Sequence, residues 1–267
     1  MEVDIREGQN KHLENLIKQG EYLKFCQAEQ TDPVWKGFIY NLKKGTMKFL
    51  INASIHTLPT QNNLKLWNKS TSDKCKLCDN RDSTLHTLSG CRVALVEGRF
   101  TWRHDNIVRY ICDSIDKTKV EVYSDIPGYR TANGGSIPAE FTITLDKPDI
   151  VIVDRKNKAV NIFELTVPFE SNIKERNTYK NNKYAYLLTD ISELRPSVTA
   201  FEIGVRGFVT KENKARLENI HKYCDKSIKF KTFLENISVL AINSSYYIFT
   251  CRKEPTWSMS TPLKAPF

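Results

Sequence analysis

The stretch "KPDIVIVDRKNKAVNIFELTVPFE", residues 147–170, contains two apolar runs that flank the polar turn "RKNK". Runs of this kind predict two β-strands joined as a hairpin. Side chains alternate between the two faces of a strand, so Glu164 shares a face with Ile162 and Thr166. A carboxylate among such apolar neighbours is costly to bury unless it is paired or holds a metal. Glu164 is therefore a candidate functional residue.

Asp149 is a second candidate, at the start of the first strand. Pro148 cannot donate to a central hydrogen-bond ladder, which puts Asp149 at the strand entrance. Pairing across the turn then brings the Asp149 and Glu164 carboxylates together at one end of the sheet. Two carboxylates this close repel each other unless a cation neutralises them. Because oxygen ligands favour Mg²⁺ or Mn²⁺, we expect a divalent-cation site there.

The segment "ESNIKERNTYKNNKYAYLL", residues 170–188, predicts a helix after the hairpin. Helical spacing puts Lys180 on the stripe that faces the sheet, with Lys183 one turn further on. An Asp, a Glu and an inward Lys around a divalent cation suit phosphodiester hydrolysis, because the metal generates hydroxide and neutralises developing charge. The structural alternative is a buried Lys–Glu pair, or a lysine whose ammonium reaches solvent.

A dense cysteine cluster precedes this region. Cys75, Cys78, His86 and Cys91 have the spacing C-x2-C-x7-H-x4-C. Four ligands within a segment too small to have its own core predict one tetrahedral zinc. Four protein ligands leave no open position, so such a zinc is structural. The alternative is a set of unrelated buried cysteines with a stray histidine. A zinc knuckle of this kind suits nucleic-acid contact or a spacer role between domains.

The charge of the chain favours a polyanionic partner. The 267 residues include 40% hydrophobic residues, enough for a core, and carry a net charge of +9 with a pI of about 9.1. Nucleic acid is the simplest partner for such a chain. Between Lys36 and Lys74 there are seven lysines against one acid, Asp73. This stretch is either a solvated helix face or a surface that follows phosphates.

The remaining four cysteines are scattered, which argues against a secreted disulfide framework and favours a reducing compartment. No apolar run is long enough to span a bilayer, and the N-terminus shows no signal-peptide pattern. We therefore expect no membrane partner.

Local patterns predict the other elements. Amphipathic helices are expected at 10–27, 35–58 and 101–115, and two more within 211–240. Further strands are expected at 119–125, 140–145 and 200–209, and a loose tail at 252–267. His104 falls on the inward stripe of the helix at 101–115.

The order of these pieces resembles the C-terminal region of site-specific non-LTR retrotransposon reverse transcriptase polyproteins. The matching segments are "LPTQNNLKLWNKSTSDKCKLCDNRDSTLHTLSGC", "WRHDNIVRYI", "PD", "ELTVPFE" and K-x-x-KY, and the resemblance covers about residues 36–210. It implies an α/β fold with a PD-(D/E)XK restriction-endonuclease-like core, in which a helix, a mixed sheet and a second helix follow one another. A small zinc knuckle and an N-terminal helical segment precede this core.

The resemblance also implies residue roles. Asp149 matches the first acid of the motif and Glu164 the second. Thr166 stands where the usual motif has its lysine; the retrotransposon branch moves that lysine into the following helix, where Lys180 and Lys183 match. The "RHD" segment matches at residues 103–105, so His104 and Asp105 join the candidate catalytic set. Arg109 is expected to form a surface pair with Asp105.

The expected domains are a helical, lysine-rich segment at 1–70, a CCHC zinc knuckle at 71–98, the endonuclease at 99–245 and a tail at 246–267. The resemblance implies a nuclear, metal-dependent DNA endonuclease with structural Zn²⁺ and catalytic Mg²⁺ or Mn²⁺. It would cut a DNA target to give a 3′ end that primes reverse transcription. Its other partners would be the element RNA and an upstream reverse transcriptase domain. The chain shows no polymerase motif, so it is expected to be a fragment or a relic of the larger protein. The alternative is a zinc-knuckle nucleic-acid-binding module whose nuclease fold is inactive.

Overall fold

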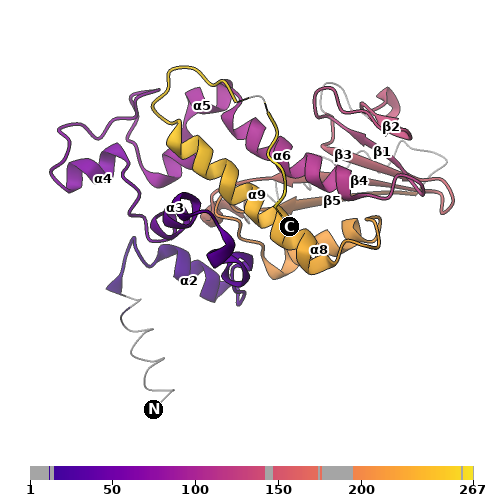
Figure 1. The fold of residues 1–267 in the computed structure, drawn as a ribbon, viewed down its shortest axis with the longest axis horizontal. Coiled ribbons are helices and arrows are strands. Elements are labelled where there is room, and N and C mark those ends of the chain that lie inside the picture. Colours follow the sequence, from indigo (N-terminus) through magenta and orange to yellow (C-terminus); the bar gives the residue numbers. More distant parts are fainter. Residues whose placement is uncertain are drawn as a thin grey trace, which may run out of the picture.

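The computed structural model describes residues 12, 15–141, 147–173, 175, 195–259 and 261–266. The described helices are α2 (Glu21–Ala28), α3 (Lys44–Ser54), α4 (Gln61–Leu66), α5 (Arg92–Val96), α6 (Arg99–Ser114), α8 (Lys211–His221) and α9 (Phe230–Thr250). The strands are β1 (Glu121–Ser124), β2 (Gly134–Gly135), β3 (Ile150–Asp154), β4 (Ala159–Thr166) and β5 (Arg195–Glu202). The protein is thus a mixed α/β structure (Figure 1).

The five strands form one mixed sheet in the order β2-β1-β3-β4-β5. The predicted hairpin is confirmed, since β3 and β4 are antiparallel and Ile150 pairs with Phe163. This register puts Asp149, which precedes β3, opposite Glu164 at one end of the sheet. β5 runs parallel to β4, so the connection between them must cross over from one end of the sheet to the other.

Helices α6, α8 and α9 cover one face of the sheet (Figure 1). The predicted stripe on α6 is confirmed, because Ile107, Val108 and Ile111 are fully buried against that face. Alternate residues of β3 and β4 point to the opposite face, where Val151 and Ile162 belong to a smaller apolar cluster. Glu164 lies on this second face, as the period-two pattern predicts.

The N-terminal region differs from its prediction. The helix expected at 35–58 is split into two short 3₁₀ turns, Val34–Gly37 and Ile39–Asn41, followed by α3. The physical reason is tertiary packing, since Phe38 is buried in one cluster with Leu50 of α3 and Ile242 of α9. Helix α4 was not expected. Its N-terminus is capped by the Thr60 hydroxyl, which accepts a hydrogen bond from Asn63 N at 3.3 Å.

Two strand predictions are corrected in part. The strand expected at 200–209 is β5, which begins at Arg195 and ends at Glu202; the chain then turns through Gly207 at φ +73°. Residues 139–141 form a 3₁₀ turn, so the strand expected at 140–145 does not begin there. Residues 142–146 lie outside the described part of the chain.

The prediction of a loose C-terminal tail is wrong. Helix α9 continues to Thr250, and the chain that follows packs along α6. Buried Arg99 donates to the carbonyls of Cys251 and Glu254, both at 2.7 Å. Trp102 Nε1 donates to Thr261 O at 3.2 Å. The segment has little propensity for helix or strand, which is why its sequence predicted a loose tail. Hydrogen bonds from Arg99 and Trp102 of α6 nevertheless hold it in place.

Among the helices of the described ranges, none combines the length and the apolar composition needed to cross a bilayer.

Candidate functional site

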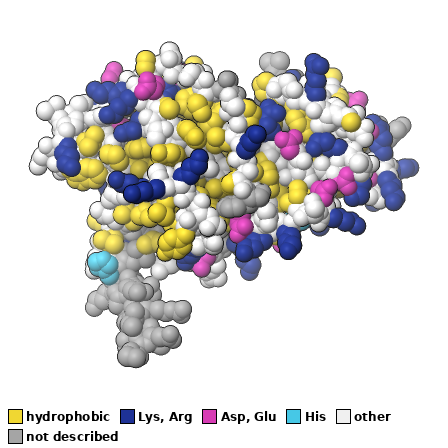
Figure 2. Space-filling view, in the orientation of Figure 1, with side chains coloured by type: hydrophobic (Ala, Val, Ile, Leu, Met, Phe, Trp, Pro, Cys, Tyr) yellow, Lys and Arg dark blue, Asp and Glu magenta, His cyan; other side chains and the backbone are white. Residues whose placement is uncertain are grey.

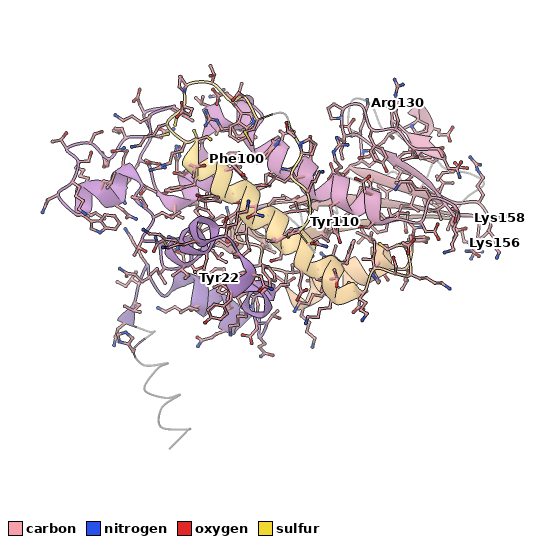
Figure 3. The ribbon with its side chains drawn as sticks, viewed as in Figure 1. Tyr22, Phe100, Tyr110, Arg130, Lys156 and Lys158 are labelled. Carbon is pink, nitrogen blue, oxygen red and sulfur yellow. The ribbon has the colours of Figure 1, made fainter. Side chains whose placement is uncertain are left out.

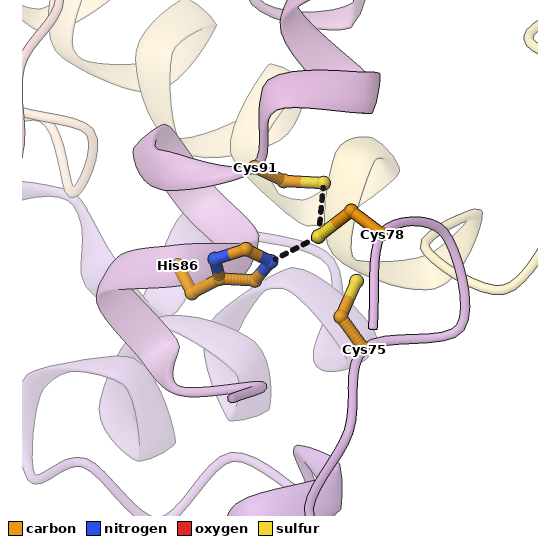
Figure 4. A group of neighbouring side chains, drawn as sticks. All are labelled: Cys75, Cys78, His86 and Cys91. Carbon is orange, nitrogen blue, oxygen red and sulfur yellow. Dashed lines mark hydrogen bonds between the residues drawn. The ribbon is translucent and has the colours of Figure 1, made fainter. Parts of the chain in front are cut away.

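Cys75, Cys78, His86 and Cys91 converge on one point (Figure 4). Their candidate ligand atoms all lie within 4.8 Å of one another. Cys75 and Cys78 lie on either side of a tight turn in which Leu77 N donates to the Cys75 sulfur at 3.4 Å. His86 begins a short π-helical turn, and Cys91 immediately precedes α5. The sequence prediction that these four residues form a cluster able to hold a metal ion is confirmed.

The geometry of the cluster fits a tetrahedral ion. Cys78 Sγ lies 3.7 Å from Cys91 Sγ and 3.3 Å from His86 Nε2. Zinc–sulfur bonds of about 2.3 Å and zinc–nitrogen bonds of about 2.0 Å give tetrahedral edges of roughly 3.8 and 3.5 Å. Burial lowers the pKa of His86, which keeps the imidazole neutral, as a ligand must be. Burial also raises the pKa of Cys91 to about 12, so a cation is needed to favour its thiolate.

Arg103 joins this cluster region to the sheet. Its guanidinium is 1% exposed and donates to Leu88 O at 2.8 Å, Ser245 Oγ at 3.2 Å and Val167 O at 3.2 Å. These acceptors belong to the π-helical turn, to α9 and to the residue that follows β4. Burial lowers the pKa of Arg103 to about 9. No carboxylate of the described residues forms an ion pair with it, so carbonyl and hydroxyl groups solvate this charge.

The second candidate site is at the open end of the β3–β4 hairpin. Asp149 N donates to Glu164 Oε1 at 3.1 Å, and Leu165 N donates to Asp149 Oδ2 at 2.7 Å. Glu164 is 1% exposed, whereas the Asp149 side chain is 16% exposed. Asp149 and Glu164 thus lie opposite each other across the hairpin, and each carboxylate accepts a hydrogen bond from a backbone N–H of the other strand. Mg²⁺ is commonly held by one or two carboxylates together with water and substrate phosphates, so this donor set fits it.

His104 reaches the same site from α6. Its Nε2 lies 3.1 Å from Asp149 Oδ2 and its Nδ1 lies 3.0 Å from Asp105 Oδ1. Burial opposes the charged imidazole, but Asp149 and Asp105 together outweigh burial and raise the pKa of His104 to about 10. Asp105 thus contacts His104, whereas the Asp105–Arg109 surface pair expected from sequence is not among the ion pairs of these described residues.

Lys180 and Lys183 lie outside the described residues, so their predicted approach to the carboxylates stays a prediction. Asp149 and Glu164 both make further interactions beyond those given above.

Two residues near Asp149 were missed in the sequence. Ser124, at the end of β1, donates from its hydroxyl to Asp149 O at 2.9 Å. Asp125 follows it; burial raises the pKa of Asp125, the nearby Lys147 ammonium opposes this, and Asp149 adds to the rise. The signal was the polar "SD" pair at the end of a strand. This pair can be recognised as part of the site only when β1 is known to pair with β3, because that pairing brings Ser124 close to Asp149.

A groove of about 410 Å³ opens beside His104. One wall comes from the knuckle at residues 71–98 and another from the start of α6. The third is formed by the end of β4 and the residues that follow it, from Leu165 to Asn172. The lining residues are Ser89, Leu95, Phe100, Thr101, Arg103, His104, Leu165, Thr166, Val167, Pro168, Phe169 and Asn172. Phe100 is labelled in Figure 3.

No protein-family model matches this chain, and no curated protein matches it. The functional assignment therefore rests on these two sites.

Proposed function

We propose that the chain is a metal-dependent DNA endonuclease of the PD-(D/E)XK type, from a non-LTR retrotransposon. The observation that carries the proposal is the meeting of Asp149 and Glu164 at one end of a mixed sheet, with His104 in contact with Asp149. A helix on one sheet face, followed by a mixed sheet with two adjacent acids, is compatible with a restriction-endonuclease-like core. The resemblance in motif order adds the retrotransposon context, with a nuclear location and an upstream reverse transcriptase.

In this proposal, Asp149 and Glu164 hold a Mg²⁺ or Mn²⁺ ion. When bound, the ion would supply a hydroxide nucleophile and neutralise charge on the scissile phosphate. The Asp149 carboxylate is held by Leu165 N, which donates to Oδ2, and by His104 Nε2, and the Ser124 hydroxyl donates to the backbone carbonyl of Asp149. Such support fixes the direction of the carboxylate before substrate arrives. Lys180 or Lys183 would orient the attacking water or the phosphate.

The cysteine–histidine cluster holds a structural Zn²⁺ in the same proposal. The four ligands leave no position for substrate, so zinc would fix the shape of the knuckle. Arg103 then transmits that shape to the nuclease region, because it bonds both the Leu88 carbonyl of the knuckle and the Val167 carbonyl after Glu164.

The test is nicking of supercoiled plasmid with and without Mg²⁺, by the wild-type chain, Asp149→Asn and Glu164→Gln. Each amide variant should cut roughly 100-fold more slowly or worse, the usual range when a group that stabilises transition-state charge is lost. The matched control is Glu218→Gln, which removes an exposed carboxylate on α8 and should cut normally. DNA affinity of the two site variants should stay the same or rise, because each removes one negative charge.

Chelation by EDTA alone is a poor control, since it strips zinc as well. Omission of Mg²⁺ followed by its addition to the zinc-loaded chain separates the two metals. A zinc-loaded wild-type chain that binds plasmid tightly but never nicks it with Mg²⁺ or Mn²⁺ would refute the nuclease. It would leave the alternative, a nucleic-acid-binding module with an inactive nuclease fold.

A further inference from the structure

We propose that the groove between the knuckle and the end of β4 binds one unpaired nucleotide of the DNA, next to the scissile phosphate. This inference rests on the proposed nuclease function and adds the form of DNA that its site accepts.

The groove is continuous with the candidate catalytic site. His104 lines the groove and also contacts Asp149. Thr166 lines it as well, on the same strand face as Glu164 and two residues further on, which is roughly 7 Å along the strand. A phosphate held at the two carboxylates therefore has its neighbouring nucleotide at the mouth of the groove.

The groove has polar atoms that lack partners. The Thr166 hydroxyl and Arg103 Nε are both buried, and neither has a hydrogen-bond partner in the described structure. Buried polar groups are nearly always bonded, so each such atom calls for a partner. Arg103 itself is 1% exposed and its guanidinium is already bonded to Leu88 O, Ser245 Oγ and Val167 O, so this side chain shapes the wall of the groove.

The size and the remaining walls select a single nucleotide. A volume of about 410 Å³ lies in the range that holds one small ligand, and it cannot admit stacked base pairs. Phe100 and Leu95 give the apolar and aromatic surface against which an unpaired base stacks. Hydrogen-bonding groups among the lining residues come from Asn172, Ser89 and Thr101. A base can enter only if it leaves its duplex, which costs least where DNA is already open.

The test compares two fluorescent DNA duplexes, one fully paired and one with a short central bubble. Binding is measured by anisotropy with the zinc-loaded chain and no added Mg²⁺, so that no strand is cut. The wild-type chain should bind the bubble about tenfold more tightly, the range expected for one base stacked on protein.

Two variants on the same helix locate the effect. Leu95 is 57% exposed and lines the groove, whereas its neighbour Val96 is 81% exposed and does not. Leu95→Glu and Val96→Glu add the same charge, so both should weaken binding to either DNA equally through general repulsion. Only Leu95→Glu should also abolish the preference for the bubble. Thr166→Val, which removes the hydroxyl and keeps the shape, should reduce that preference.

Equal affinity of the wild-type chain for the two duplexes would overturn the inference, and so would equal loss of preference in the two glutamate variants. This experiment measures binding without Mg²⁺, so its result is independent of the plasmid nicking test, and the groove and the nuclease can fail separately. A bubble preference that Leu95→Glu removes, in a chain that never nicks, refutes the nuclease and keeps the groove. Nicking without any preference refutes the groove and keeps the nuclease.

Discussion

Lys180 is the residue on which the catalytic interpretation depends most. If its charge serves catalysis, Lys180→Met should cut roughly 100-fold more slowly, as when a transition-state-stabilising group is removed. Its melting temperature in Mg²⁺ should change little, because the cation still neutralises Asp149 and Glu164. A purely structural partner of buried Glu164 would instead cost about 3–5 kcal/mol of stability when removed. Single-turnover nicking and thermal melts decide between these outcomes.

Lys183→Met is the natural comparison for that experiment. A fully active Lys180→Met beside an inactive Lys183→Met would show that the helix face was assigned wrongly by one turn.

His56 should make stability depend on pH. Burial, followed by the charge of Arg206, lowers the pKa of His56 from 6.5 to about 4. As pH falls, the unfolded chain takes up this proton near pH 6.5 and the folded chain only near pH 4. Stability is therefore lost on acidification through that window, by up to about 3 kcal/mol. Glu21 lies 3.3 Å from the ring, but its carboxylate is 44% exposed and too well solvated to reverse the shift.

The comparison for this prediction is His56→Asn. His56 has φ +54°, a conformation that asparagine tolerates well, and asparagine does not titrate. Unfolding by denaturant at several pH values should show the wild-type chain losing more stability between pH 7 and pH 4. Parallel curves for the two chains would contradict the assigned pKa.

Among the contacts between elements, a buried ion pair joins the N-terminal helices to the segments that follow β4 and β5. Arg206 Nη2 lies 2.7 Å from Glu170 Oε2, and both side chains are at most 1% exposed. The guanidinium is 4.2 Å from the ring centroid of Tyr22 on α2 and 4.3 Å from that of Phe169. It also donates to Ala53 O on α3 at 3.2 Å. This residue therefore contacts three elements at once.

Arg206→Met should destabilise the fold by about 3–5 kcal/mol, because it leaves the Glu170 carboxylate buried without its partner. Chemical unfolding measures this loss, and adding Glu170→Gln should recover part of it. The control is Lys36→Met, which breaks the exposed Lys36–Asp32 pair and should cost about 1 kcal/mol or less. A loss of similar size in both variants would show that the buried pair has no special role.

The knuckle should depend on its metal. Purified wild-type chain should contain about one zinc, as four protein ligands imply. Cys78→Ser should lose it and melt at a lower temperature, because metal binding contributes directly to folding. Cys251→Ser is the matched control, since Cys251 is a partly exposed free cysteine outside the cluster. A metal-free wild-type chain with an unchanged melting temperature would rule out the zinc site.

At the scale of the whole molecule, the net charge of +9 should make DNA binding depend strongly on salt. The seven lysines between Lys36 and Lys74 are all exposed. Both interpretations of that stretch require this exposure, so it does not decide between them. Lys and Arg side chains also gather at the far end of the sheet (Figure 2), where Figure 3 labels Lys156 and Lys158.

Replacing Lys44 and Lys48 by glutamine should reduce the slope of log affinity against log salt by about 0.9 for each DNA phosphate that the chain no longer neutralises. The matched change of Lys156 and Lys158 alters net charge equally at the other end of the molecule. A larger reduction of the slope in the Lys44/Lys48 variant than in the Lys156/Lys158 variant would assign phosphate binding to the lysine-rich stretch. Equal effects would mean that total charge alone matters, and a slope near zero in the wild-type chain would exclude binding to the DNA backbone.

Features that depend on residues close together in the chain could be predicted from the sequence alone. The β3–β4 hairpin follows from two apolar runs and a polar turn, and its register brings Asp149 to Glu164 across 15 residues. The metal cluster follows from four ligands between Cys75 and Cys91. The buried stripe of α6 follows from helical spacing. In each case the interacting groups are close in the chain, so a local pattern carries the information.

The way in which these elements join could not be predicted and is visible only in the folded protein. Arg99 bonds Cys251 O across 152 residues, and Arg103 bonds Ser245 Oγ across 142. No local pattern identifies an arginine that will be buried among carbonyl groups, because arginine is usually exposed and its acceptors come from distant segments. The docked tail, the broken helix at 35–58 and the groove beside His104 all depend on such long-range interactions. These interactions form only when distant segments of the chain have come together in the folded state, so they leave no pattern in the local sequence.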